Sequence, residues 1–313
     1  MNIWVYILRR TLYVIPILFG VTFIVFLLFN VLNDDPTYQL LGKHASEERA
    51  MELRKELGLD KPLYMQYLDV VKSAVTFDFG RSWKSKQLIT EMIREGAPVS
   101  LSFTLPGFFI STVLGILISL LVAYYRGTYI DKFVVFVCIC GMSISSLAYI
   151  LFCQWYFAYE LGLFEISGYE YGFPDFLPYV SLPIIIWLIL SLGPDVRFFR
   201  TIMLDEIYQD YVRTARAKGL SEPYVLLKHV LKNALIPIIT YVVIQIPFLL
   251  LGALLIETFF SIPGLGGILV KAIYDQDFPV VKAMTVFISV GYIIFNLLSD
   301  ILYTVVDPRV RLK

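Results

Sequence analysis

Six long runs of apolar residues constrain the folds open to this 313-residue chain. Each run has about the length that an α-helix needs to cross the hydrocarbon core of a bilayer, roughly 20 residues. Apolar residues make up 58% of the chain and charged residues 17%, against roughly 25% charged in an average soluble domain. We therefore expect an all-α integral membrane protein with six transmembrane helices, at residues 12–32, 99–125, 133–159, 180–198, 236–260 and 280–306.

Polar segments between these runs divide the chain into four parts. Residues 1–32 comprise the N-terminus and the first span, which is too long for a signal peptide and has no small-residue cleavage site after it. Residues 33–98 are charged and polar with apolar residues at helical spacing, which predicts a helical cap outside the bilayer. Residues 99–306 hold the other five spans, and residues 307–313 form a short tail.

The distribution of Lys and Arg predicts the orientation, because short cytoplasmic loops are enriched in both. Residues 161–178, on the opposite side from the N-terminus, contain neither residue. The basic residues on the side of the N-terminus are Arg9, Arg10, Arg126, Lys132, Arg309, Arg311, Lys313 and seven positions between 197 and 232. Both termini are therefore expected in the cytoplasm, and the polar cap on the extracytoplasmic side of a cell (inner) membrane.

Several function classes find no support in the residues. The chain has no GxxxxGK[ST] motif to hold a nucleoside triphosphate, and its two histidines, His44 and His229, are far apart and outside any HExxH motif. The three cysteines lie within one apolar run and are expected to be small buried hydrophobes, so we predict no metal site and no catalytic residue. The zero net charge offers no argument for nucleic acid binding.

Acidic residues are also expected to avoid the middles of the spans, where ion-coupled carriers place their functional groups. The acidic residues near the apolar runs fall toward the ends of those runs, at Glu160, Asp195, Glu257 and Asp300. An ATP-independent secondary carrier or channel is therefore the less favoured alternative, and the driving force is expected to come from another protein.

The basic loop at about 199–235 is the segment most suited to such a contact. Tyr211, Thr214, Ala215 and Lys218 are predicted to share one face of a short helix that Gly219 ends, and Ser221 is expected to cap the next helix. Small residues on an exposed helix permit the close approach of a partner. From the residues alone, the loop could equally bind anionic lipid headgroups.

The loop resembles that of permease subunits of ATP-binding cassette (ABC) importers. Arg213, Thr214 and Ala215 fall on the E-A-A positions of the general pattern, with Arg213 in place of Glu. Residues 209–220 read QDYVRTARAKGL, which is similar to the B-type subunit of the branch that imports dipeptides, oligopeptides and nickel. Five further segments of this chain resemble motifs of that branch: LGLD at 57–60, DFGRS at 78–82, ETFFSIPGLG at 257–266, DFP at 277–279 and DPRVR at 307–311.

This resemblance implies a fold, partners and sites. Residues 99–306 would be an ABC transmembrane type-1 domain that forms half of a pathway for di- or oligopeptides, or alternatively for nickel chelates or another small solute. The implied partners are a second homologous permease subunit, two ABC ATPase subunits that bind ATP and Mg, an extracytoplasmic solute-binding protein and membrane lipid. The chain itself would hold no cofactor and would not be an enzyme.

Three groups of residues receive roles from the resemblance and from their positions. A coupling helix seated in an ATPase groove would use Tyr211, Arg213, Thr214, Ala215, Arg216, Ala217, Lys218, Gly219 and Leu220. An outer mouth or gate, built as a turn or re-entrant segment, would use Glu257, Phe260, Ser261, Pro263, Gly264, Leu265 and Gly266. Asp300 is expected to form an ion pair at the cytoplasmic end of the last span.

Overall fold

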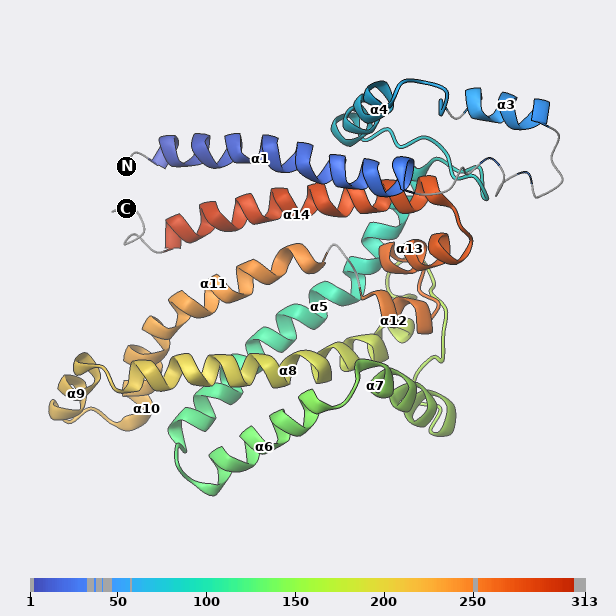
Figure 1. Ribbon diagram of the computed structural model, residues 1–313. Helices are drawn as coiled ribbons and strands as arrows, with labels where there is room; N and C mark the ends of the chain where they lie inside the picture. Colours follow the sequence, from blue (N-terminus) through green and yellow to red (C-terminus); the bar gives the residue numbers. More distant parts are fainter. Residues whose placement is uncertain are drawn as a thin grey trace. The chain divides into compact units, whose positions relative to one another are not determined.

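The computed structural model of this protein describes residues 3–32, 37, 41, 47–56, 58–249 and 253–306, and their regular structure is helical (Figure 1). The helices of the N-terminal part are α1 (Ile3–Phe26), the π-helical turn η1 (Leu27–Val31), α3 (Glu47–Glu56) and α4 (Leu63–Thr76). The others are α5 (Ile89–Tyr124), α6 (Tyr129–Ser143), α7 (Ser146–Cys153), η2 (Gln154–Glu160), α8 (Leu177–Ile207), α9 (Asp210–Ala217), α10 (Glu222–Val225), η3 (Leu226–Val230), α11 (Leu231–Leu249), α12 (Leu254–Phe259), α13 (Leu265–Tyr274) and α14 (Phe278–Val306).

The predicted all-α membrane architecture is confirmed. Within the described residues, five helices are long and apolar enough to cross a membrane, and a sixth span results if α6 and the helix Ser146–Glu160 count as one. Four of the long helices contain internal prolines, which membrane helices tolerate because neighbouring groups satisfy the freed backbone carbonyls.

The expected single span at 133–159 is bent by 92°. Helix α6 ends at Ser143, and the next two residues, Ile144 and Ser145, take extended backbone angles before α7 begins. The Tyr149 hydroxyl donates a hydrogen bond of 2.9 Å to the Gly141 carbonyl, which the break deprives of its helical partner. The run that the sequence predicted as one span at 133–159 is therefore broken at Ile144 and Ser145.

The chain divides into two compact units, each described by itself. The first comprises residues 1–95 and 268–298. In it, α4 packs on α1, and Val25 of α1, Ala74 of α4 and Val286 of α14 form a shared buried cluster. The loop after α4 and the start of α14 are joined by hydrogen bonds described below.

The second unit comprises residues 96–267 and 299–313. Helix α8 packs against α6, α7 and α11 (Figure 1). One buried cluster includes Phe103, Ile186 and Phe260, and a second includes Phe199 and Val212. Helix α9 therefore packs on a hydrophobic core of its own unit.

An ion pair ties α6 to α8 in the second unit. The Arg200 guanidinium donates to both carboxylate oxygens of Asp131, at 2.7 and 2.8 Å, and the Gly127 amide donates to the same carboxylate at 2.9 Å. Both charged side chains are largely buried, and a two-point contact of this kind fixes direction as well as distance. Close approach of the two helices is further permitted by Gly193 of α8, where a side chain would meet Met142.

Candidate functional site

The predicted coupling segment forms a short, well-defined helix. Helix α9 covers Asp210–Ala217, as the sequence predicted, and Gly219 follows it with φ of 77°. That left-handed angle is easily adopted by glycine and unfavourable for other residues, which explains the stop at this position. The chain then turns at once into α10.

The inner face of α9 differs from the predicted one. Val212 and Ala215 are buried in the second unit's core together with Val225, Val230 and Phe199. Ala215 is small because it packs against the chain's own helices, and it is not available for a partner. Of the four residues predicted to share one face of the helix, Tyr211 is half-buried, Ala215 is buried, and only Thr214 and Lys218 are exposed.

Two polar contacts hold α9 to its surroundings. The Arg216 guanidinium donates to both oxygens of Glu222 at 2.6 and 3.0 Å, so Arg216, which was assigned to the coupling surface, is bound within the loop. The Tyr211 hydroxyl donates to the Glu206 carboxylate near the end of α8. Burial, reinforced by this carboxylate, raises the pKa of Tyr211 to about 12, and the hydrogen bond to Glu222 raises the pKa of Arg216 further above its ordinary value.

The outward face of the loop is basic and sterically open. Arg213, Thr214, Ala217, Lys218 and Leu220 are exposed. Arg213 lies 3.6 Å from Asp210, and since both side chains are largely in solvent this pair contributes little. Exposed cations beside a small residue are suited to contact with an acidic, groove-shaped surface.

The expected cap at Ser221 is wrong in one respect. Ser221 occupies the position before α10, and Pro223 lies in the first turn as predicted, but the serine side chain makes no capping hydrogen bond. The carboxylate of Glu222, at the first helical position, is held by Arg216. The loop is therefore closed by an ion pair between its two helices.

The predicted outer-mouth segment is a helix–turn–helix in which α12 ends at Phe259 and α13 begins at Leu265. Glu257 is fully buried at its centre. Its carboxylate accepts hydrogen bonds from the Ser100 hydroxyl at 2.7 Å and from the Gly267 amide at 2.8 Å. Ser100 in turn accepts from the Leu265 amide at 2.8 Å, so the turn closes around one carboxylate and one hydroxyl.

The glycines of this segment are required by that closure. A Cβ atom on Gly264 would lie 2.5 Å from both the Glu257 carboxylate and the Ser100 hydroxyl. Of the residues assigned to a gate, Phe260, Leu265 and Gly266 are buried in the turn, while Ser261 and Pro263 are exposed. Their role at an outer mouth stays a prediction, and the exposed pair is the part that a partner could reach.

A second carboxylate anchor lies in the first unit, joining two motifs far apart in sequence. Asp277 accepts hydrogen bonds from the Ser82 hydroxyl at 2.5 Å and from the backbone amides of Trp83 and Lys84 at 3.0 and 3.3 Å. The segments DFGRS and DFP, which both resemble motifs of the importer family, are therefore joined by hydrogen bonds in the folded chain. The resemblance of each segment to a motif of one family could be seen in the sequence. The contact between the two segments could not be predicted from it.

Two acidic residues remain from the sequence analysis. Asp195 was expected near the end of a span, but α8 continues to Ile207, so Asp195 lies in the interior of the helix and accepts a 3.3 Å hydrogen bond from the Tyr241 hydroxyl of α11. Asp300 falls within α14, and its side chain lies outside the described part of the structure. Its ion pair stays a prediction.

Several membrane-length helices, joined by a short basic helix seated on an internal core and by a carboxylate-closed turn, define a multi-pass membrane protein. The model of the family described as "Binding-protein-dependent transport system inner membrane component" matches residues 115–312. The corresponding N-terminal model matches residues 3–104. The chain belongs to this family of ABC importer permeases, and the resemblance noted from its motifs is confirmed.

Curated relatives cover nearly the full length of the chain. A putative peptide transport system permease protein of Brucella abortus (strain 2308) is 37% identical over 309 residues, which cover 97% of this chain and 98% of the relative. The glutathione transport system permease protein GsiC of Shigella flexneri serotype 5b (strain 8401) is 33% identical over 308 residues, covering 98% and 99%. GsiC of Escherichia coli (strain K12) matches over the same length and with the same identity.

Proposed function

We propose that this chain is one of two permease subunits of an ATP-driven importer of peptides, and that α9 transmits the action of an ATPase subunit to the spans. The observation that carries the coupling role is the two-sided character of α9. Its inner face is fixed by the buried Val212 and Ala215, while its outer face presents Arg213, Ala217 and Lys218. Because the inner face of α9 is packed on other helices, a bound ATPase subunit that displaces α9 also displaces those helices.

The same proposal assigns the remaining partners and the orientation. A second permease subunit completes the pathway, two ATPase subunits bind ATP and Mg and hydrolyse ATP, and an extracytoplasmic protein delivers the solute. Both termini and α9 lie in the cytoplasm. The clustering of Arg126, Arg213 and Lys218 at one end of the second unit supports this, since Arg126 lies over the ring of Tyr208 at the end of α8, close in sequence to α9.

The proposed solute is a di- or oligopeptide. The support is the names of the relatives, a peptide transport permease and a glutathione transport permease, both of which match almost the whole chain. Glutathione is itself a small peptide, so both names point to one solute class. Nickel chelates or another small solute are the alternatives that the same machinery would accept.

The coupling role is tested in the purified complex reconstituted with its ATPase subunits and binding protein. Ala217→Trp adds bulk to the outer face of α9, and Lys218→Glu reverses an exposed charge there. Each is expected to weaken ATPase association and solute-stimulated ATP hydrolysis by about tenfold or more, which corresponds to roughly 1.4 kcal/mol. The matched controls are Ala148→Trp on α7 and Lys55→Glu on α3, both at exposed positions outside the loop that holds α9.

Assembly and stimulated hydrolysis that are unchanged in Ala217→Trp and Lys218→Glu would contradict the coupling role. Solute uptake that persists in vesicles without the ATPase subunits would instead favour an ATP-independent carrier. The solute class is tested separately, by identifying what co-purifies with the binding protein. A metal chelate there would replace the peptide assignment without affecting the coupling result.

A further inference from the structure

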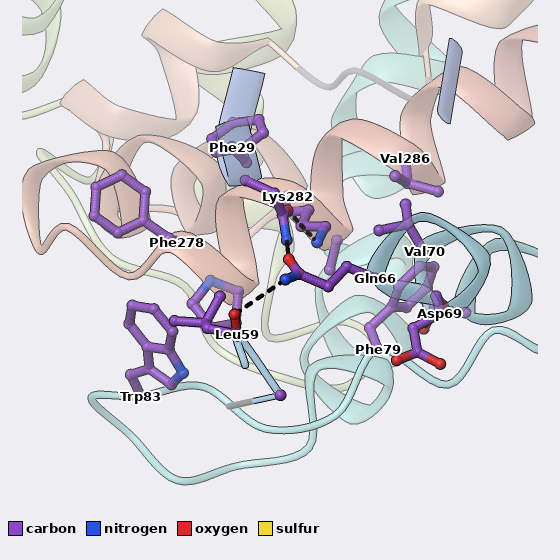
Figure 2. A pocket seen from close by; sticks show the side chains of 15 residues that line it. Phe29, Leu59, Gln66, Asp69, Val70, Phe79, Trp83, Phe278, Lys282 and Val286 are labelled. Atoms are coloured by element: carbon purple, nitrogen blue, oxygen red, sulfur yellow. Dashed lines mark hydrogen bonds between the residues drawn. The ribbon is translucent and has the colours of Figure 1, made fainter. Parts of the chain in front are cut away.

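A cavity of about 250 Å³ lies within the first unit, apart from both the coupling loop and the carboxylate-closed turn. It is enclosed by η1, α4, the start of α14 and the segments before α4 and α5. Its walls include the aromatic rings of Phe29, Phe79, Trp83 and Phe278. Figure 2 shows Gln66 and Lys282 converging on its interior. Asp277 accepts a hydrogen bond from the backbone amide of Trp83, and Phe278 is the residue that follows Asp277. Two aromatic residues of the cavity wall are therefore held in place.

The polar side chains of the cavity form a chain of hydrogen bonds with a fixed direction. The Lys282 ammonium donates to the Asn30 side-chain oxygen at 2.8 Å, and the Asn30 amide nitrogen donates to the Gln66 side-chain oxygen at 3.0 Å. The Gln66 nitrogen then donates to the carbonyls of Leu59 and Lys61 at 3.2 and 2.9 Å. Because lysine only donates, both amides are oriented by it.

One acidic and one basic side chain line the cavity, and they do not form an ion pair with each other. Asp69 and Lys282 are the charged residues that line it, and Asp69 pairs with Lys61 at 2.7 Å. Within the described residues, no carboxylate lies within ion-pair distance of the Lys282 ammonium, which uses one of its three donors on Asn30. The Asp69 carboxylate acts on the Lys282 ammonium only from beyond ion-pair distance. A cation withdrawn from water is costly, and an anion bound closer to it offsets that cost.

The position of the cavity indicates the source of the anion. Asn30 lies near the last residue of the span Arg9–Val31, and Lys282 lies near the first residue of the span Phe278–Ser299. Aromatic and basic side chains at span ends are typical of the headgroup region of a bilayer. Helix α4 packs on α1 and leaves Tyr64, Leu68 and Val75 exposed, an apolar stripe suited to lie in the interface.

We propose that this cavity binds the headgroup phosphate of an anionic phospholipid, with the Lys282 ammonium as the charged ligand. The aromatic walls contact the glycerol backbone, and Asn30 and Gln66 hold the ammonium toward the cavity. The site would make a specific lipid part of the importer's structure where α1, α4 and α14 meet. It is independent of the solute and of the ATPase contact.

The test uses the full chain, purified in detergent and titrated with phosphatidylglycerol or phosphatidylcholine, with bound lipid counted by native mass spectrometry. Wild-type protein is expected to bind phosphatidylglycerol more tightly than phosphatidylcholine. Lys282→Met is expected to weaken phosphatidylglycerol binding by about tenfold or more, since it removes a charge-assisted hydrogen bond. Lys282→Arg is expected to retain the preference, and Lys72→Met, which removes an exposed charge on α4 outside the cavity, is the matched control.

Equal affinity of the wild-type chain for the two lipids would overturn the proposal, and this holds even if Lys282→Met does not fold. An equal loss in Lys72→Met and Lys282→Met would show only general charge attraction, which also overturns it. In a third arm, dialanine is added to the loaded protein. Displacement of phosphatidylglycerol from wild type by dialanine would assign the cavity to a peptide carboxylate and refute the lipid assignment.

Discussion

Replacing Glu257 provides the sharpest test of the carboxylate-closed turn. The side chain is fully buried and receives hydrogen bonds from the Ser100 hydroxyl and the Gly267 amide. Glu257→Ala removes the acceptor and leaves both donors buried without a partner. A buried donor left without its acceptor costs about 1–3 kcal/mol, so the loss for the two donors is expected to be about 2–6 kcal/mol. That is a large fraction of the roughly 5–15 kcal/mol by which proteins are stable.

The assay is thermal unfolding of the purified chain in detergent, followed by loss of the monodisperse species. The expected decrease in melting temperature is on the order of 10 °C. Glu257→Gln should fall between wild type and Glu257→Ala, because its amide oxygen replaces one acceptor while its NH₂ group opposes the other donor. Glu160→Ala, at an exposed position, is the control and should change stability by less than about 0.5 kcal/mol.

A Glu257→Ala protein that melts together with Glu160→Ala would refute this reasoning. Such a result would mean that the turn does not depend on the buried carboxylate. The outer-mouth segment would then have to be stabilised by apolar packing alone.

Three further outcomes follow from contacts described above. Ser82→Ala and Asp277→Asn are expected to lower stability non-additively, by 0.5–3 kcal/mol of coupling energy in a double-mutant cycle, because they remove the same bond; additive losses would contradict the Asp277 anchor. Gly264→Ala should destabilise the chain because its Cβ would lie 2.5 Å from two buried oxygens, whereas Gly20→Ala, with nothing within 4 Å, should be neutral in the same melting assay. The pKa of Tyr211 is raised from 10 to about 12, so its contribution to stability is complete below pH 10 and is lost as the pH rises to 12. Tyr211→Phe should remove that part of the loss of stability at alkaline pH. An unchanged dependence of stability on alkaline pH in this variant would contradict the prediction.

The sequence predicted those features that depend on local pattern. Apolar runs of membrane length located the spans, and the short helix at 210–217 followed from its spacing and from Gly219. These predictions succeed because helix formation and membrane crossing depend on residues near one another in the chain. The resemblance of motifs such as DFGRS and DFP to one family was equally local, and the family comparison confirmed it.

The features that were missed depend on tertiary contacts. Ala215 was expected to face a partner, but helical spacing cannot distinguish a face packed on the chain's own core from a face that awaits another protein. Arg216 was assigned to the ATPase contact, but its guanidinium binds Glu222, six residues away on the next helix. The Asp277 anchor spans a sequence separation of 195 residues, so no pattern in a single sequence could have paired it with Ser82.

The attachment of α9 has a mechanical consequence. Helix α8 ends two residues before the Gln209 that precedes α9, and the helix that begins at Glu222 continues through η3 to Leu249, a length of roughly 40 Å at 1.5 Å per residue. Because Arg216 joins α9 to Glu222, the first residue of that helix, a rotation of α9 would be passed on to a helix of membrane length. Over a length of roughly 40 Å, a tilt of about 5° would displace the far end by roughly 3.5 Å.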